Sequence, residues 1–579
     1  MLKALRLVLI LSLCAACAQA PRQLGPPQRL DLIELTIDQA HQAMRHHVIS
    51  CEQLTRRYLQ RIQAYDQPTG LNAIVYVNPN ALPRARRLDQ KFARRGQMEK
   101  LHCMPVILKD NFDTADMPTE AGSIAMRGSH PPDDAFMVRR LRAEDAIILA
   151  KSNMAEWAFS PYHTISSTHG ETRNAYDLTR VPAGSSGGTA SAIAANFGII
   201  GMGTDTGNSI RGPAAHLALV GIRSTIGATS RDGVVPLLLN RDIAGPLMRT
   251  VRDTAIVYSV VAGYDPADPA TEAGRTRVKA DYTAFLKPDG LSGARLGVLR
   301  ALVDTETADV EVLARMDAAL TALREAGAVL VDPFEIPDFE RLKNATGFCS
   351  RFRYDLKNYL ASLGAAAPIH SLDEVAASKR FLPSSAEAMQ WAMSTDGDPQ
   401  SQTPPCVDVQ GDPRRREFLE AVVAAMDGAR VDALIYPTWN NPPRKIGDDE
   451  SPHGNNSPVI APHTGQPAIT VPMGFTETGL PLGLQFLARP FDEHKLFQYA
   501  YAYEQATHHR RPPPGFGRLD TGAADSASEL DKRRHLLRGR HHQRIEGVAL
   551  ADEAGEQEDI EQGLIGRARD RRVRTPAAQ

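Results

Sequence analysis

The sequence predicts an α/β protein with a mixed β-sheet core covered by α-helices. Short apolar stretches typical of buried strands, such as residues 105–109 and 146–150, alternate with longer segments in which apolar residues recur at helical spacing. This alternation is typical of a sheet buried between helices. The 579 residues, 42% of them hydrophobic, are enough for a sizeable core. Large α/β proteins often fold as one unit, so we expect one main domain.

The N-terminal half alternates predicted helices and strands. Apolar residues recur at helical spacing from Leu35 to Ala64, and Ser50 occupies the N-cap position of a helix within this segment. A further helix is expected after the first strand, and the small residues 190–196 form another. The strands predicted in this half are residues 71–77, 105–109, 146–150 and 198–202.

The C-terminal half continues the pattern. A strand–helix–strand unit is predicted, with strands at residues 295–299 and 328–331 and a helix at 312–325. Two late strands follow at residues 467–472 and 482–486. The stretch 383–458 is rich in Pro, Asp, Ser and Gly. We therefore expect irregular structure there, within the same domain.

Two glycine-rich stretches, residues 183–190 and 203–213, contain serines in predicted loops. Glycines let backbone N–H groups approach a small reacting centre, and the N–H groups of residues 206–209 are placed to converge on an oxyanion. A serine hydroxyl such as that of Ser209 is a weak nucleophile unless a base takes its proton. Lys109 is the candidate base, because three apolar residues precede it and burial lowers the pKa of a lysine. The pattern predicts acyl transfer.

A second interpretation of the first loop stays open. Gly184-Ser-Ser-Gly-Gly188 also fits the G-x-S-x-G turn of serine hydrolases and esterases, with Ser186 as the nucleophile. That site needs a downstream acid and a histidine, for which His463 or His494 could serve. It is less favoured, because Val181-Pro182 precedes the turn where a strand is expected and because the stretch around Ser209 is left without a role.

From about Leu35 to Arg511 the chain resembles the amidase signature family. The motifs that carry the resemblance are Leu71-Asn-Ala73, Pro105-Val-Ile-Leu-Lys-Asp-Asn111, Lys151-Ser-Asn-Met-Ala-Glu156, Gly184-Ser-Ser-Gly-Gly188, Asp205-Thr-Gly207, Ser209-Ile-Arg211 and the segment 465–474. Several separated motifs in the family's order make a chance agreement implausible. The resemblance implies the amidase signature fold and hydrolysis of carboxamide C–N bonds through an acyl-enzyme, with release of ammonia or an amine.

The resemblance also implies a role for each residue of the site. Ser209 is expected to be the acylated nucleophile, Ser185 the serine after a cis peptide bond that relays the proton, and Lys109 the base. No metal or organic cofactor is expected. The residues expected to form the oxyanion hole and to bind substrate are Thr206, Gly207 and Asn208.

Two positions depart from the family pattern, because Ala183 and Asn208 stand where glycine is usual. Asn208 keeps its N–H and tolerates unusual φ values, so we expect the oxyanion hole to survive. The direction of its side chain stays open, with the acyl pocket as one choice. Asp205 and Arg211 are expected to brace the nucleophile loop.

The substrate is expected to be a small-molecule or peptide amide. A second function in the same family is the ammonia-generating amidotransferase subunit that serves a tRNA-bound substrate. That subunit works in the cytoplasm with partner subunits, whereas the N-terminus of this chain indicates export. A net charge of −2 gives no basic excess for nucleic acid. The sequence does not indicate an oligomeric state.

The first 18 residues are predicted to be a signal peptide. Basic residues precede an apolar run over residues 7–13, and small residues follow. Cys17 follows Ala15-Ala16 as in bacterial lipoproteins, so lipidation of Cys17 and simple cleavage both stay open. Both routes predict export to a bacterial envelope, either free in the periplasm or anchored to a membrane by lipid.

The catalytic domain implied by the resemblance is predicted over residues 30–515. The charged stretch 516–579 has no apolar face and is predicted to be a solvated, mostly disordered tail. Four cysteines lie in the predicted domain and allow three pairings. Because their spacing is wide, buried free thiols are expected for Cys51, Cys103, Cys349 and Cys406.

Overall fold

The computed structural model describes residues 30–395 and 397–519. One mixed sheet organises them. Its strands are β1 (Ile74–Val77), β2 (Pro105–Lys109), β3 (Ile147–Ser152), β6 (Ile200–Asp205), β7 (Val220–Arg223), β8 (Ile243–Met248), β9 (Arg295–Val298), β10 (Val329–Val331), β11 (Ala433–Pro437), β12 (Ala468–Phe475) and β13 (Pro481–Leu487). They lie in the order β1-β3-β2-β6-β8-β7-β12-β13-β11-β9-β10. A separate hairpin pairs β4 (Thr164–Ser166) with β5 (Gly170–Thr172).

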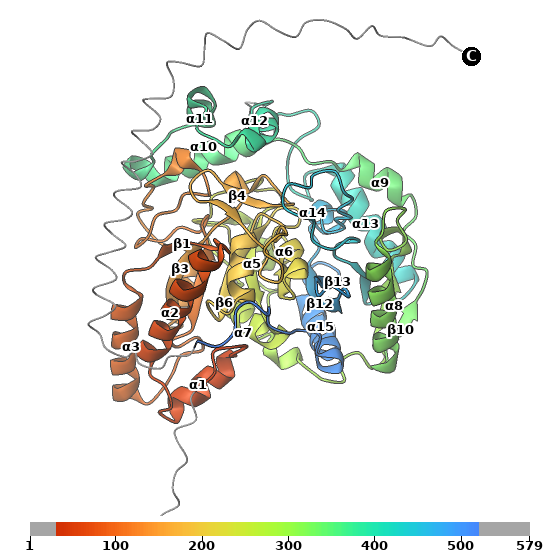
Figure 1. Ribbon diagram of the computed structural model, residues 1–579. Helices are drawn as coiled ribbons and strands as arrows, with labels where there is room; N and C mark the ends of the chain where they lie inside the picture. The colour runs from red at the N-terminus through yellow and green to blue at the C-terminus, as the bar shows by residue number, and fades with distance from the viewer. Residues whose placement is uncertain (1–29, 396, 520–579) are drawn as a thin grey trace, which may run out of the picture. The chain divides into compact units, whose positions relative to one another are not determined.

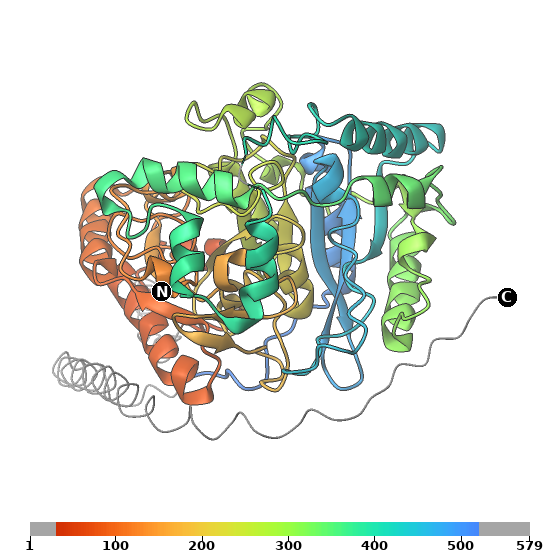
Figure 2. The ribbon, with the colours of Figure 1, turned by 90° about the horizontal axis from the view of Figure 1, so that it is seen from above.

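Helices lie on both sides of this sheet (Figures 1 and 2). They are α1 (Ile37–Arg45), α2 (Cys51–Thr69), α3 (Ala81–Arg95), α4 (Phe136–Ala143), α5 (Gly187–Ala194), α6 (Arg211–His216), α7 (Val251–Val261), α8 (Val310–Glu325), α9 (Phe339–Ala345), α10 (Phe352–Leu363), α11 (Leu372–Ser378), α12 (Ala386–Ala392), α13 (Pro413–Gly428), α14 (Ala461–Thr464) and α15 (Glu493–Thr507). The predicted α/β class, with a mixed sheet covered by helices, is confirmed. No helix of the described segments is both long and apolar enough to cross a bilayer.

Helix α2 begins where the sequence predicts. The Ser50 side chain accepts the Gln53 N–H at 3.2 Å, and the Gln53 side chain accepts the Ser50 N–H at 2.9 Å. This reciprocal capping box satisfies two N–H groups that a helix start otherwise leaves unpaired. The helix ends at Gly70, which adopts a left-handed conformation with φ 76°.

The parallel strands β2, β3 and β6 place the chemically important residues at one edge of the sheet. Strand β2 lies between β3 and β6 and runs parallel to both. Every residue of β2 and β6 is buried, as expected for central strands. Lys109 ends β2 and Asp205 ends β6, so both lie at the carboxyl edge, where α/β proteins commonly bind ligands.

The prediction of irregular structure over residues 383–458 is wrong in part. Helix α13 and strand β11 both lie within this stretch, and β11 pairs with β13 and β9 inside the sheet. The prolines misled the prediction, since Pro413 occupies the first turn of α13, where no N–H partner is lost. Asp412 caps this helix by accepting the Arg414 N–H at 3.0 Å.

The prediction of free thiols is also wrong. Cys51 is bonded to Cys103, and Cys349 is bonded to Cys406. Wide spacing in the sequence did not prevent pairing, because the fold brings the Cα atoms to 5.4 and 5.7 Å, within the range that a disulfide spans. The first bridge joins the start of α2 to the turn before β2.

The packed chain continues past residue 515, where the sequence placed the end of the domain. Phe516 is buried, with its ring 5.7 Å from that of Tyr65. Arg61 of α2 donates to the carbonyl oxygens of Phe516 and Gly517 at 2.9 and 2.8 Å. The predicted signal peptide, Cys17 and residues 520–579 of the predicted tail lie outside the described residues.

Candidate active site

Lys109 lies at the centre of the site, fully buried at the end of β2. Its Nζ donates to Ser185 Oγ at 2.7 Å and to Thr204 Oγ1 at 2.6 Å. Burial lowers the pKa of Lys109 to about 7, although the Asp242 and Asp205 carboxylates act to raise it. A large fraction of this amine is therefore unprotonated at neutral pH.

Ser185 is held in a tight loop before α5. The Gly184–Ser185 peptide bond is cis. The Ser185 carbonyl accepts the Ala155 N–H at 3.1 Å, and the Thr164 hydroxyl donates to the Ala183 carbonyl at 2.8 Å. Gly184 has no room for a side chain, because a Cβ there would lie 2.3 Å from the His163 carbonyl oxygen. The loop thus directs the buried Ser185 hydroxyl at Lys109.

Ser209 lies on the turn between β6 and α6, with 5% of its surface exposed. Within residues 30–519, position 396 excepted, its hydroxyl has no hydrogen-bond partner, and none joins it to the Ser185 hydroxyl. In the same described segments, the N–H groups of Gly207, Asn208 and Ser209 donate to no protein acceptor. The turn therefore leaves one hydroxyl and three backbone donors unused by the fold.

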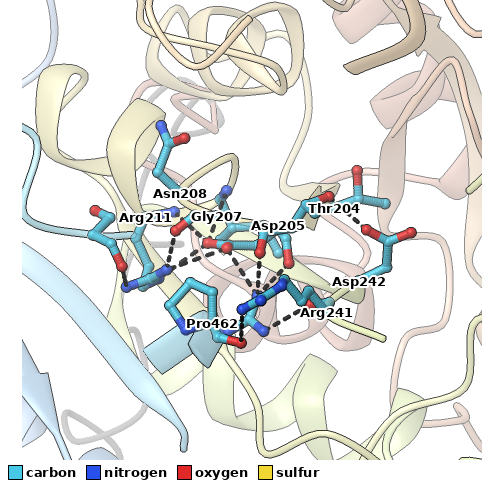
Figure 3. A network of polar contacts seen from close by, with 12 residues as sticks. Thr204, Asp205, Gly207, Asn208, Arg211, Arg241, Asp242 and Pro462 are labelled. Carbon is cyan, nitrogen blue, oxygen red and sulfur yellow. Dashed lines mark hydrogen bonds and ion pairs between the residues drawn. The ribbon is translucent and has the colours of Figure 1, made fainter. Parts of the chain in front are cut away.

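Asp205 and Arg211 brace this turn, as the sequence predicts (Figure 3). The Asp205 carboxylate accepts from Arg211 Nε and from Arg223 Nη1, both at 3.0 Å. Burial acts to raise the pKa of Asp205, but the two guanidinium groups outweigh it and hold the pKa at about 2. Arg211 also donates to the Gly207 carbonyl at 2.7 Å. The brace holds the backbone beside Ser209 without entering the reacting centre.

Thr204 is a residue of the site that sequence reasoning missed. Its hydroxyl oxygen accepts from Lys109 Nζ and, at 3.1 Å, from Asn111 Nδ2. The signal that was available is a threonine directly after the apolar residues 200–203 of β6, where strand alternation puts it on the opposite face from Asp205.

The side chains of Thr206 and Asn208, two of the predicted oxyanion residues, make hydrogen bonds to other protein groups. Thr206 Oγ1 donates to Asp242 Oδ1 at 2.5 Å. Asn208 Nδ2 donates to the carbonyl oxygens of Gly184 and Pro161, so its side chain faces the Ser185 loop. Among the described residues, the backbone N–H groups of Thr206, Gly207 and Asn208 donate to no protein acceptor, so an oxyanion hole at these three residues stays a prediction that rests on the backbone.

The alternative nucleophile Ser186 is occupied elsewhere. Its hydroxyl donates to the Thr204 carbonyl at 3.2 Å and accepts the Thr204 N–H at 3.3 Å, with no exposed surface. His463 Nδ1 lies 2.7 Å from Arg241 Nη1 rather than beside Ser186. The G-x-S-x-G interpretation therefore lacks an accessible nucleophile, and His463 is not placed to act as its base.

A cavity of ≈ 460 Å³ is lined in part by residues that contact the Ser185 loop. Its lining includes Phe159, Tyr162 and Trp391, and the Pro161 carbonyl between the first two accepts the Gly184 N–H at 2.9 Å. Trp157, in contrast, is 1% exposed and packs in the core. Within the described residues, no group of three or more His, Cys, Asp or Glu side chains is arranged to hold a metal ion.

Residues 53–497 match the family model described as Amidase, which covers most of the chain. The chain belongs to the amidase family. Among its relatives, a probable amidase of Arabidopsis thaliana is 31% identical over 494 residues, covering 83% of this chain and 91% of the relative. A glutamyl-tRNA(Gln) amidotransferase subunit of a Synechococcus strain is 32% identical, covering 84% and 95%.

Solved structures give the same family. The peptide amidase of Stenotrophomonas maltophilia is 37% identical, with a TM-score of 0.75, and covers 86% of this amidase and 100% of its own chain. A peptide amidase in complex with the competitive inhibitor chymostatin is 38% identical, with a TM-score of 0.73 and coverages of 83% and 99%. The protein is therefore an amide-hydrolysing enzyme with the amidase signature fold.

Proposed function

We propose that Ser209 attacks the carbonyl carbon of a carboxamide while Ser185 relays its proton to Lys109. The Ser209 Oγ–C bond forms, and the Ser209 hydroxyl proton passes to Ser185 as the Ser185 proton passes to Nζ. The C–N bond then breaks, and the leaving nitrogen takes the proton back along the same path. Water repeats the sequence on the acyl-enzyme, which releases the carboxylate and restores Ser209.

The observation that carries this proposal is the buried contact of 2.7 Å between Lys109 Nζ and Ser185 Oγ. A neutral amine has two N–H groups and one lone pair. Thr204 Oγ1 takes one N–H at 2.6 Å, so the lone pair can accept the Ser185 proton. The Ser185 oxygen is then free to accept from Ser209, and contacts of this kind commonly shorten once substrate binds.

The unused N–H groups of Gly207, Asn208 and Ser209 support an oxyanion hole on the same turn. Negative charge develops on the amide oxygen when Ser209 attacks. Preorganised donors at such a position commonly contribute about 3–4 kcal/mol each to the transition state. The Asp205–Arg211 brace fixes the direction of these groups before substrate arrives.

The substrates we propose are small-molecule or peptide amides. Peptide amidases at 37% and 38% identity support this class. The amidotransferase subunits among the relatives support a second candidate, an ammonia-generating subunit for a tRNA-bound substrate. Ammonia release from free amides by the isolated chain would favour the hydrolase, and dependence on partner subunits would favour the second candidate.

We also propose that the enzyme is exported. The signal-peptide pattern of residues 1–18 and the two disulfides support an oxidising compartment. Mass spectrometry of the protein from its host is expected to find no peptide from residues 1–16. A diacylglycerol adduct on Cys17 would establish the lipid anchor, whereas an intact Met1 would contradict export.

The test of the nucleophile is labelling by a serine-directed phosphonofluoridate, with ammonia release measured over a panel of amides. Ser209→Ala and Ser185→Ala are expected to abolish turnover and labelling while the protein stays folded. Ser191→Ala is the control, because the Ser191 hydroxyl donates to the Arg173 carbonyl and takes no part in the site. Labelling of Ser186 with active Ser209→Ala would contradict the proposal.

A further inference from the structure

The side chain of Asn208 joins the two loops that carry the serines. Asn208 immediately precedes Ser209 and is 2% exposed. Its Nδ2 donates to the Gly184 carbonyl at 3.1 Å and to the Pro161 carbonyl at 3.3 Å. In Figure 3 its carboxamide points away from the Asp205–Arg211 contacts. This side chain therefore belongs to the Ser185 side of the site, although its backbone belongs to the nucleophile turn.

The two acceptors are themselves connected. The Pro161 carbonyl that accepts from Asn208 also accepts the Gly184 N–H at 2.9 Å. The Gly184 carbonyl that accepts from Asn208 belongs to the peptide bond that leads into Ser185. Asn208, Pro161 and Gly184 thus form a closed ring of three hydrogen bonds, and this ring fixes the plane of that peptide against the residue before Ser209.

The packing leaves the Asn208 amide little freedom to turn elsewhere. A Cβ on Gly212 of α6 would lie 2.5 Å from Asn208 Nδ2 and 3.0 Å from the Trp439 ring, so the space is filled on that side. The Gly212 N–H donates to the Asn208 carbonyl at 2.7 Å, which holds the backbone.

We infer that Asn208 is a positioning residue that keeps the Ser185 hydroxyl in register with Ser209. The inference rests on the proposed roles of these two serines. A proton relay needs its oxygen atoms aligned within a fraction of an ångström, and each serine lies on a separate loop. The Asn208 amide connects the two loops at a point next to both serines. Its loss is expected to misalign the proton relay. The oxyanion donors are backbone groups and remain in place.

The test compares Asn208→Ala and Asn208→Asp with matched changes at Asn174. Asn174 is also buried, and its Nδ2 donates to the carbonyl oxygens of Val181 and His216, so it makes the same kind of contacts without bonding to a residue next to either serine. Aspartate keeps the size of asparagine but cannot donate to carbonyl oxygens. For each variant we would measure kcat, KM, the rate of phosphonofluoridate labelling and the melting temperature. If Asn208→Asp does not fold, Asn208→Ala alone tests the inference.

In both Asn208 variants, kcat and the labelling rate are expected to fall about 10- to 100-fold, because a small misplacement of the reacting groups lowers the rate by this much. KM is expected to stay near the wild-type value, since ground-state binding is untouched. Asn174→Ala is expected to lower the melting temperature alone. Two outcomes would overturn this inference but leave the proposed function in place, provided that Ser209→Ala is inactive. One is a wild-type kcat in Asn208→Ala, and the other is an equal loss of kcat in Asn174→Ala. Activity in Ser209→Ala would overturn the proposed function and this inference with it.

Discussion

At the scale of single residues, the proposed base Lys109 is expected to set the pH range of the enzyme through its ionisation. Burial lowers the pKa of Lys109 to about 7, and only the neutral amine can accept a proton. The acylation rate is therefore expected to rise with pH through one ionisation near pH 7 and to stay constant above it. Single-turnover acylation measured against pH checks this.

Lys109→Arg is the companion variant. A guanidinium stays protonated throughout the accessible pH range, so this variant is expected to be nearly inactive at every pH. Near-normal hydrolysis by Lys109→Arg would show that another group takes the proton.

Thr204 offers a second prediction at this scale. Thr204→Val keeps the shape of the side chain and removes the acceptor that Lys109 Nζ contacts at 2.6 Å. Because the charged amine loses more from this change than the neutral one, the pKa of Lys109 is expected to fall, and the acid limb of the rate profile is expected to shift to lower pH. The plateau rate is expected to fall about 10-fold or more as the amine loses its orientation. Thr204→Ser should restore both quantities, and an unchanged profile in Thr204→Val would argue against this role.

Lys109, Ser185 and Ser209 could be proposed from the sequence because each lies in a local motif. The sequence could not place Thr204 or the Asn208 side chain. Thr204 acts through a contact with β2, a strand far away in the chain. The direction of the Asn208 side chain depends on Pro161 and Gly184, which only the fold brings next to it.

At the scale of elements, the Cys349–Cys406 disulfide anchors a loop beside the nucleophile turn. The neighbouring Phe348 is 40% exposed, and its Cζ lies 3.4 Å from where a Cβ on Gly207 would be. Replacing both cysteines with alanine is expected to cost about 2–4 kcal/mol in the free energy of unfolding and to raise KM as the loop moves. Chemical denaturation and steady-state kinetics measure the two effects.

The Cys51–Cys103 pair provides the control for this prediction. It closes a loop of similar length, with a separation of 52 residues against 57, but joins α2 to the turn before β2. Its removal is expected to lower stability without a comparable rise in KM. Equal KM values in the two double variants would contradict a role for the Phe348 loop in substrate binding.

Element prediction succeeded where local signals were strong and failed where composition misled. The capping pattern at Ser50 predicted the start of α2. Helix α13 was missed because its first proline was counted with the surrounding loop. Strand β11 was missed because its five residues lie within the same stretch, 383–458. The disulfides were missed for another reason, since pairing depends on distances that the sequence does not contain.

At the scale of the whole molecule, the C-terminal end of the described chain packs against α2. A chain ending at residue 519 is expected to match the full-length enzyme in activity and melting temperature. A chain ending at residue 514 loses the buried Phe516 ring and two acceptors of Arg61, so it is expected to lose about 3 kcal/mol or more in stability. Thermal and denaturant unfolding of the matched pair checks both. Equal stability of the two truncated chains would show that these contacts contribute little.

The strand order has a consequence for folding of the chain during its synthesis. β12 and β13 are the last strands to be made, yet they lie between β7 and β11 and join the two ends of the sheet. Until synthesis reaches them, each half of the sheet carries an open strand edge that can pair with another chain. A chain truncated before residue 468 is thus expected to form two half-sheets, each with an exposed strand edge, and to aggregate rather than fold into a smaller enzyme.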